Sequence, residues 1–344
     1  MIFGARVHIR KPDAGQWRQA FPDGLGASAF SSPGFQRAIL DTEPSGWVQR
    51  AVSVDGSDLW LPVLGRRDRV GRWELRVLPV AYDVMPVQRA RLSQVELDTW
   101  IDALCTPRIS HFIWWLPPWH TDGLRIEPRR HLGGGLTVGS HRTYVIRLDG
   151  TADEHLERNV STTMRRYVRR NDKAGVTVVA KPDGAQIDAY FGVYQQSFHD
   201  NGWVGEMFPR RFLDAAARTL GRGGELAVVL HEGQVVGGGI LMFDRDALHY
   251  FQGAIDRGVK DINPHVALYT YALRCAEARG IRHVNLGGVN DGNEGLMRFK
   301  TSWGAEATSA TMLTFTSGAR YTWAAVRERL PSGRLARLLG GGSR

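Results

Sequence analysis

Lysine is scarce in this sequence of 344 residues. Only five of its 44 lysines and arginines are lysines, at positions 11, 173, 181, 260 and 300. Codon usage in a GC-rich genome accounts for the abundant arginine, but not for a lysine between Phe299 and Trp303 in the stretch LMRFKTSWGAE. A lysine ammonium is a compact, strongly hydrated point charge on a flexible stem, which the planar fork of arginine does not reproduce. Lys300 is therefore a candidate functional residue.

Long apolar segments are also missing. No window approaches the roughly 18 uninterrupted apolar residues that a membrane helix needs, and the charged start of the chain is not a secretory signal. Cys105 and Cys275 lie far apart in helical patterns, so we expect reduced, buried thiols. These features predict a cytoplasmic protein without integral membrane association.

Several catalytic motifs are absent. The sequence contains no HExxH, no CxxC and no clustered histidine pair, so we expect no metal site. It contains no GxSxG elbow and no GxxxxGK[ST] loop, which argues against an esterase triad and a P-loop nucleotide hydrolase. The chemistry has to come from other residues.

Length and charge limit the remaining possibilities. A chain of this length exceeds a usual single core, so two domains of roughly 150 residues each are expected. The formal net charge of +9 and the pI of about 9.9 favour polyanionic partners. Basic proteins are also common in arginine-rich proteomes, so the charge alone decides nothing.

The same order of elements occurs twice. Ala51 to Asp83 and Leu226 to Asp256 each contain apolar runs separated by short turns, which is typical of antiparallel meanders. A helical pattern and a further apolar strand follow each meander. This repeat predicts an α/β (α+β) fold of two similar tandem domains, each with a central, mostly antiparallel sheet flanked by helices.

We place the domain boundaries at 1–138 and 139–318, followed by a basic helical tail at 319–344. Gly133 to Gly135 are expected to form a turn in a linker, and Thr143 to Leu148 a strand that starts the second domain. The tail is expected to be a solvated terminal helix, with an RNA surface or an anionic membrane as the alternative contacts.

A strongly basic helix is predicted early in the second domain. Thr151 to Glu154 have the pattern of a capping box, and a second helix is expected from Ser161 to Gly175. Charges of one sign repel one another unless an anion offsets them, which favours contact with phosphates. A solvated helix face is the alternative. The cations of this helix are Arg165, Arg166, Arg169, Arg170 and Lys173.

A resemblance to a known family depends on the end of the second domain. The meander, the helix that begins NPHVALYTYALRCAEARGI, the next strand and FKTSWGA together resemble the Fem-like branch of the GNAT acyltransferase superfamily. That branch has two tandem GNAT-type domains and makes peptidoglycan cross-bridges from aminoacyl-tRNA. The resemblance covers about residues 30–315. The family's Phe-Lys and aromatic-Gly pairs correspond to Phe299, Lys300, Trp303 and Gly304, and its basic helix to Arg165–Lys173.

One segment departs from the GNAT enzymes that use acetyl-CoA. Those enzymes hold the CoA pyrophosphate on a glycine-rich loop before a helix. Here DRGVKDINPHVALY has Gly258 but no second glycine, and Pro264 stands just inside the helix. The sequence also lacks the long heptad-patterned arm of some Fem-like members.

The resemblance therefore implies an aminoacyltransferase. It would form an amide bond by moving an amino acid from aminoacyl-tRNA to the amine of a small-molecule or peptide acceptor, in natural-product or cell-wall synthesis. Aminoacyl-tRNA is then a co-substrate, and no cofactor is expected. The alternatives are a GNAT-type N-acyltransferase with an acyl-CoA or acyl-carrier donor, and a non-catalytic polyanion-binding module.

The site residues are predicted from the chemistry of this reaction. An aminoacyl ester is already activated, so catalysis needs orientation, a route for one proton and stabilisation of the oxyanion, but no covalent nucleophile. We predict that Lys300 places its ammonium against the 3′-terminal phosphate of tRNA or the developing negative charge. Phe299 and Trp303 are predicted to line the pocket, with Trp303 as a stacking surface for a terminal base. Alternatively, both rings are core and Lys300 reaches solvent.

Further substrate contacts are expected where strands end. Tyr250, Gln252 and Asn285 are candidates in the second domain. Tyr82 and Asp83, at the end of a strand in the first domain, are candidates for the acceptor site because a carboxylate can hold an amine. A surface turn is the alternative for these two residues.

Overall fold

The computed structural model describes most of the chain. The described residues are 6–20, 29–42, 46–57, 60–76, 92–116, 118–121, 123–131, 134–200, 208–289 and 292–317. Tyr82, Asp83 and the basic tail 319–344 lie outside the described residues.

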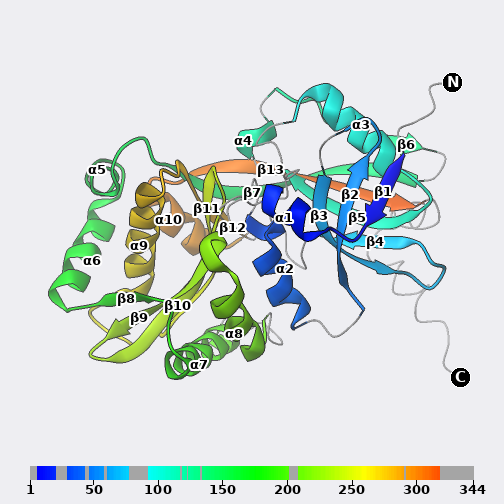
Figure 1. Cartoon of the computed structure of the whole chain (residues 1–344). Coiled ribbons are helices and arrows are strands. Elements are labelled where there is room, and N and C mark those ends of the chain that lie inside the picture. The colour runs from blue at the N-terminus through cyan, green and yellow to red at the C-terminus, as the bar shows by residue number, and fades with distance from the viewer. Residues whose placement is uncertain are drawn as a thin grey trace, which may run out of the picture.

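One mixed sheet runs through both halves of the molecule (Figure 1). Its order is β1-β2-β3-β4-β5-β13-β7-β12-β11-β10-β9-β8, and β6 pairs with β7. The strands are β1 (Val7–Arg10), β2 (Val48–Val54), β3 (Trp60–Arg67), β4 (Trp73–Arg76), β5 (Ile109–Leu116), β6 (Arg129–His131), β7 (Gly134–Arg147), β8 (Thr177–Ala180), β9 (Gly224–His231), β10 (Gln234–Phe243), β11 (Ala247–Ile255), β12 (His283–Gly288) and β13 (Glu306–Ser317).

Helices cover the sheet and connect its strands. The α-helices are α1 (Ala14–Ala20), α2 (Pro33–Leu40), α3 (Gln94–Leu104), α4 (Pro118–Thr121), α5 (Ala152–Arg158), α6 (Thr162–Lys173), α7 (Gly184–Asp200), α8 (Arg210–Thr219), α9 (Pro264–Ala278) and α10 (Glu294–Thr301). The described residues also form the 3₁₀ turns η2 (Ala29–Ser31) and η3 (Gly221–Gly223). No helix in the described ranges is long and apolar enough to cross a bilayer.

The two halves repeat one strand order. In the first half, β1 to β4 pair antiparallel in sequence order, and α3 then leads to β5, which lies parallel to β4. In the second half, β8 to β11 pair antiparallel, and α9 leads to β12, which lies parallel to β11. The repeated order of elements that the two meander segments predict is therefore present in the structure. Each parallel pair requires a crossover, and the helix supplies it.

The halves exchange their last strands. β7 follows β5 in the chain but pairs with β12, and β13 follows β12 but pairs with β5. The two exchanged strands pair with each other along their whole length, from Glu306 opposite Val145 to Ser317 opposite Gly134. Each half therefore completes its sheet with a strand from the other.

The predicted linker is part of this exchange. Gly134 and Gly135 already belong to β7 and pair with Ser317 and Thr316, so the boundary at 138/139 falls inside a strand. The chain reverses just before them, because His131 of β6 pairs antiparallel with Gly134. A Cβ on Gly134 would lie 2.2 Å from the Thr316 carbonyl oxygen, so glycine is needed at this position because β7 and β13 approach closely.

Local signals explain how the second half forms. Glu232 and Gly233 both have positive φ, as a two-residue hairpin turn requires, and they join β9 to β10. The capping box of Thr151 and Glu154 begins α5. α6 begins after its N-cap, Ser161, and Gly175 follows its end with φ +67°. These elements match the sequence expectations.

Three cores hold the layers together. The first contains α3 and the first-half strands, and the second contains α5, α9 and one face of the second-half strands. The third core lies on the opposite face, where α7 and α8 pack, and it includes α2 from the first half. Figure 1 shows α5, α6, α9 and α10 grouped on one side of β8 to β12. Cys275 is buried and Cys105 is partly buried, and both are free thiols.

Candidate active site

The parallel strands β11 and β12 pair with each other only at their beginnings in the described structure. The register runs from Ala247 opposite His283 to His249 opposite Asn285. Beyond these residues, β11 continues to pair with β10 and β12 with β7. In open α/β sheets, ligands bind at the carboxyl ends of strands where neighbours part. Tyr250, Gln252 and Asn285, all predicted site residues, lie at these ends.

Lys300, on α10, directs its amine to the end of β12. Its Nζ donates hydrogen bonds to the carbonyl oxygens of Gly287, at 2.9 Å, and Gly288, at 2.8 Å. The residue is 4% exposed, and burial lowers its pKa to about 7. Nζ also lies 5.7 Å from the centre of the Tyr144 ring. The alternative of a lysine that reaches solvent is therefore wrong, and the site contains a buried amine that titrates near neutral pH.

Three glycines at the end of β12 and after α10 have conformations or contacts that exclude a side chain. Gly287 has φ +78°, a left-handed conformation that turns its peptide at the strand end. A Cβ on Gly288 would lie 2.1 Å from Nε2 of His141, so only glycine lets that ring approach. Gly304 has φ +76°, and its Cβ would lie 2.9 Å from the Cβ of Asn159. Backbone conformation or close contacts therefore require glycine at these positions of the NLGG and WG segments.

Asn285 positions the end of β12. Its Oδ1 accepts hydrogen bonds from Oγ1 of Thr143, at 2.7 Å, and from the Gly287 N–H, at 2.8 Å. Its Nδ2 lies 3.4 Å from Nδ1 of His249, whose Nε2 lies 3.0 Å from Oδ2 of Asp244. Asn285 is buried, and its side chain contacts protein groups. We expected a substrate contact, whereas the geometry makes Asn285 the support of the peptide that holds the lysine.

Aromatic rings fill the space between α9 and α10. Tyr269 is the centre of this cluster, with ring centroids 4.8 Å from Tyr250, 5.3 Å from Phe299 and 5.2 Å from Trp303. Trp303 is fully buried, so its ring has no exposed face, and this corrects the expectation that it stacks on a nucleotide. Phe299 is partly buried and packs against the same core.

The outer end of the cluster carries His265. The Tyr250 hydroxyl lies 3.4 Å from Nδ1 of His265. Burial, and then the nearby charge of Arg257, lowers the pKa of His265 to about 4, so the ring is neutral at pH 7. Burial also raises the pKa of Tyr250 well above its usual range. The two groups therefore form a neutral polar pair within an aromatic wall.

Gln252 has a donor without a partner. The pairing of β10 with β11 shifts so that Ile240 lies opposite Gln252 and Leu241 opposite Tyr250, which leaves an extra residue in β11. Such a bulge redirects neighbouring side chains. The Gln252 Oε1 accepts from the Tyr190 hydroxyl at 3.2 Å, but its buried Nε2 has no hydrogen-bond partner among the described residues. A buried, unpaired amide indicates a missing acceptor.

The basic helix α6 bridges the two helices of the site. The Ser161 N–H, before its first turn, donates to the Ser302 carbonyl at 2.8 Å. Near its end, the buried Asn171 bonds both the N–H and the C=O of Asn263, the N-cap of α9. α6 thus packs beside α9, as Figure 1 also shows, and its N-cap contacts the C-cap of α10.

The cations of α6 differ in their partners. Arg165 donates to the Glu157 carbonyl and to Thr162, and Arg170 lies 3.7 Å from Asp261. The remaining three cations are exposed, and within the described ranges they have no carboxylate partner. These three are Arg166, Arg169 and Lys173.

The loop before α9 carries Asp256 and Asp261 together with Arg257 and Lys260, and some of its N–H groups are already bonded. The Gly258 N–H donates to Oδ1 of Asp256 at 2.7 Å, and the Val266 N–H bonds to its N-cap, Asn263. Asp261 stands in this loop with φ +68°. Carboxylates therefore occupy the region in which a glycine-rich loop would present free N–H groups to a pyrophosphate.

The structure brings most predicted residues into one region. Lys300, Phe299, Trp303 and Asn285 surround the ends of β11 and β12, and α6 adjoins them. Sequence reasoning missed the supporting side chains of His141, His249 and Tyr269. The spacing of Asp244 and His249 across a turn was a usable signal. His141 could not be found because it lies between the predicted turn at Gly133–Gly135 and the predicted strand at Thr143–Leu148, where no element was predicted. In the described ranges, no three His, Cys, Asp or Glu side chains form a group suited to a metal ion.

Comparisons with known proteins agree with this geometry. Residues 158–301 match the acetyltransferase (GNAT) domain. The crystal structure of FemX is similar over 96% of this chain and 99% of FemX, with a TM-score of 0.65 and 13% identity. The chain has the fold of a Fem-like GNAT-branch protein. The predicted α/β fold with GNAT-type halves is thereby confirmed.

Two further structures share the fold. A conserved protein of unknown function from Bacteroides thetaiotaomicron has a TM-score of 0.58 and 10% identity, over 90% of this chain and 99% of that one. L-PGS from Bacillus licheniformis has a TM-score of 0.51 and 10% identity, over 91% and 93% of the chains. A search of curated proteins found no match. The matched GNAT domain, which contains Lys300 and α6, supports an acyltransferase.

Proposed function

We propose that the protein is an aminoacyltransferase that moves an amino acid from aminoacyl-tRNA to the amine of a small-molecule or peptide acceptor. The observation that carries this proposal is the buried amine of Lys300, held by two carbonyls where β11 and β12 part. The exposed cations of α6 lie on the helix that adjoins this point. The reaction needs no cofactor, because the aminoacyl ester supplies the activated carbonyl.

Lys300 is suited to move the proton of this reaction. A neutral amine has two N–H donors and one lone pair, so the carbonyls of Gly287 and Gly288 use both donors and leave the lone pair free. Its pKa of about 7 makes the neutral and charged forms both accessible at physiological pH. The protein contacts therefore need not change when the amine gains a third proton.

The reaction then proceeds through a tetrahedral intermediate. The acceptor amine attacks the ester carbonyl, forming the C–N bond and placing negative charge on the carbonyl oxygen. Lys300 takes the proton from the attacking nitrogen and returns it to the ribose oxygen as the C–O bond breaks. The unpaired Nε2 of Gln252 is our candidate donor to an oxygen of the acyl group.

RNA binding is assigned to α6. Arg166, Arg169 and Lys173 are exposed and lack carboxylate partners in the described chain, so phosphate contact would not require breaking an ion pair. A polyanion would also offset the mutual repulsion of these charges. Tyr82 and Asp83 remain our proposed contacts for the acceptor.

A second candidate is an N-acyltransferase with an acyl-CoA donor. The match to the acetyltransferase (GNAT) domain favours it. The loop before α9 argues against it, because Gly258 is its only glycine and the Gly258 N–H is already bonded to Asp256. The N–H groups of Gly258 and Asn263 in this loop are bonded within the protein and are not free donors.

Binding of tRNA and of CoA separates these candidates. The purified protein is titrated with aminoacylated tRNA and with acetyl-CoA across a series of salt concentrations. We expect micromolar or tighter tRNA binding that weakens steeply with salt, and no saturable binding of acetyl-CoA. Saturable binding of CoA with weak binding of RNA would reject the aminoacyl-tRNA donor in favour of a thioester.

A further inference from the structure

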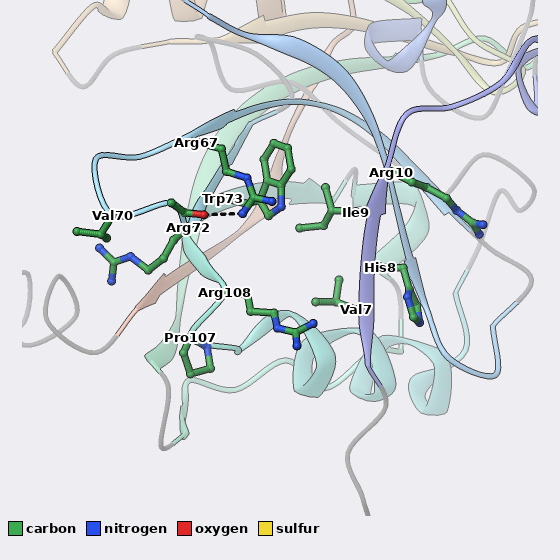
Figure 2. Close-up of a pocket in the computed structure, with 11 residues that line it drawn as sticks. Val7, His8, Ile9, Arg10, Arg67, Val70, Arg72, Trp73, Pro107 and Arg108 are labelled. Carbon is green, nitrogen blue, oxygen red and sulfur yellow. Dashed lines mark hydrogen bonds between the residues drawn. The ribbon is translucent and has the colours of Figure 1, made fainter.

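A pocket in the first half takes no part in the proposed reaction. It has a volume of about 640 Å³ and is lined by β1, by the turn between β3 and β4, and by the segment before β5 (Figure 2). This is the amino-terminal end of the parallel pair β4 and β5. The Lys300 site lies at the opposite, carboxyl end of the corresponding pair in the second half. No lining residue is acidic.

Trp73 contacts the Arg67 side chain and the backbone of Arg108 at this pocket. The guanidinium carbon of Arg67 lies 4.0 Å from the centre of the Trp73 ring, and Arg67 also donates to the Gly71 carbonyl. The backbone N–H of Trp73 donates to the Arg108 carbonyl at 2.8 Å, which ties the segment before β5 to β4. A ring and a carbonyl orient the Arg67 guanidinium without neutralising it.

Part of the positive charge here is not matched by nearby acids. Among the lining residues, Arg72 pairs with Asp68 at 3.0 Å and His8 Nε2 lies 2.5 Å from Asp55, and the neighbouring Arg66 pairs with Glu74 at 2.9 Å. In the described part of the chain, Arg67 and Arg108 have no carboxylate oxygen within 4 Å. Burial, and then the charge of Arg67, lowers the pKa of Arg50, which stands 5.0 Å from the same ring.

The pocket also has an apolar wall. Val7 and Ile9 point from β1 toward Trp73 and Arg108, whereas His8 and Arg10 point to the other side of the strand (Figure 2). This alternation follows from the period of two along a strand. The interior therefore combines the oriented guanidinium of Arg67 and the side chain of Arg108 with an apolar surface.

We propose that this pocket binds a small molecule in which phosphate groups are joined to an apolar or planar portion, such as a nucleoside diphosphate. Guanidinium forks match phosphate oxygens in pairs, and an apolar wall accepts a base or a similar group. The volume lies in the range of small-molecule sites, and a concave hollow fits a small ligand better than the backbone of a nucleic-acid duplex. The proposal does not depend on the reaction assigned to Lys300.

Calorimetric titration of the full chain at low salt tests the proposal. The probes are ADP, inorganic pyrophosphate, adenosine and a single-stranded RNA oligomer. We expect saturable binding of ADP, weaker binding of pyrophosphate, and none of adenosine. Arg108→Ala removes charge-assisted hydrogen bonds and should weaken ADP binding about ten- to hundredfold. Arg108→Lys keeps the charge without the fork and should show an intermediate loss.

Two controls make the result specific. Arg69→Ala removes the same charge from an exposed residue in the turn between β3 and β4 that does not line the pocket, and it should change the affinity less than about twofold. Lys300→Met should leave ADP binding unchanged, which separates this pocket from the second-half site. The proposal is wrong if ADP does not bind saturably, if Arg69→Ala weakens binding as much as Arg108→Ala, or if the RNA oligomer binds more tightly than ADP.

Discussion

Replacing Lys300 with methionine should make the stability of the protein respond differently to pH. Methionine has a similar length and fits an apolar environment, so it removes the titrating amine with little change in packing. In the native protein, burial lowers the pKa of Lys300 from 10.5 to about 7. The unfolded chain therefore holds a proton on this amine between about pH 7 and 10.5 where the folded protein does not.

The magnitude follows from this difference in bound protons. Because the unfolded state binds more protons, the contribution of Lys300 to the free energy of unfolding rises with pH, by about 1.4 kcal/mol per pH unit across the window. Below about pH 7 both states are protonated and the full penalty of a buried charge remains, roughly 5 kcal/mol in total. The bonds to the Gly287 and Gly288 carbonyls favour the ammonium and oppose the effect of burial, so this figure is an upper limit.

The variant has costs that oppose this relief. It leaves two carbonyls without their donor, which costs about 1–3 kcal/mol for each carbonyl that stays buried. At pH 9 the native amine is neutral, so the variant loses these bonds without removing a buried charge. Near pH 7 the removal of the charge partly compensates. The destabilisation by Lys300→Met should therefore be larger at pH 9 than at pH 7, by up to about 2.7 kcal/mol.

Urea denaturation at several pH values between 7 and 9 measures this difference. Lys260→Met serves as the control, because Lys260 is exposed and its replacement should have the same small effect at each pH. A difference between wild type and Lys300→Met that does not change with pH would refute the argument that burial governs this amine. Loss of transfer activity in a variant that remains folded would separately test its proposed role as the proton carrier.

Three further predictions concern the fold and the RNA surface. Gly175→Ala should cost about 1 kcal/mol, and Gly304→Ala should cost more. Both glycines have positive φ, but only a Cβ at position 304 would meet another residue, at 2.9 Å. Urea denaturation compares the two variants, and equal losses would refute the crowding argument. Trp303→Ala should cost about 3–5 kcal/mol by leaving a cavity in the core, and a loss below 1 kcal/mol would contradict its complete burial. Arg166→Ala combined with Arg169→Ala should reduce the slope of log affinity for tRNA against log salt by about 1.4 to 1.8 without changing stability, and an unchanged slope would place the RNA elsewhere.

Local patterns predicted the elements of the second half well. The Glu232-Gly233 turn, the capping box at Thr151 and the basic helix after Ser161 each depend on a few neighbouring residues, so a single sequence contains the information. The strand exchange could not be found in this way. It depends on pairing between β13 and β5, which are almost two hundred residues apart, and on a glycine that permits close approach where the sequence resembles a turn.

The site shows the same division between local and distant information. The motif around Lys300 was visible because lysine is scarce and stands among aromatics. The environment of Lys300 could not be predicted from the sequence, because the carbonyls that bind the amine belong to β12 and the hydrogen bonds of Asn285 reach Thr143 on β7. The motif was compatible with a lysine that contacts a ligand and with one that reaches solvent. Only the fold shows that the amine is buried against backbone oxygens.

The exchange of strands makes the two halves interdependent. Leu313 and Phe315 of β13 lie in the core of the first half, where Phe315 stacks on Phe112 with ring centroids 5.7 Å apart. Thr143 and Tyr144 of β7 lie in the second half, beside Asn285 and Lys300. A fragment of residues 139–318 keeps the whole Lys300 site but loses β5 and the first five residues of β7.

That fragment should not fold on its own. It would expose Leu313 and Phe315, each of which contributes about 1.5–3 kcal/mol when buried, and it would leave the edge of β13 that faces β5 unpaired. We expect the fragment to aggregate, or to lack cooperative unfolding by circular dichroism, while the full chain unfolds cooperatively. A soluble, monomeric fragment with a sharp unfolding transition would show that the second half is stable without its partner. The site would then depend on the first half for substrate contacts alone, and not for the sheet on which Lys300 and Asn285 are arranged.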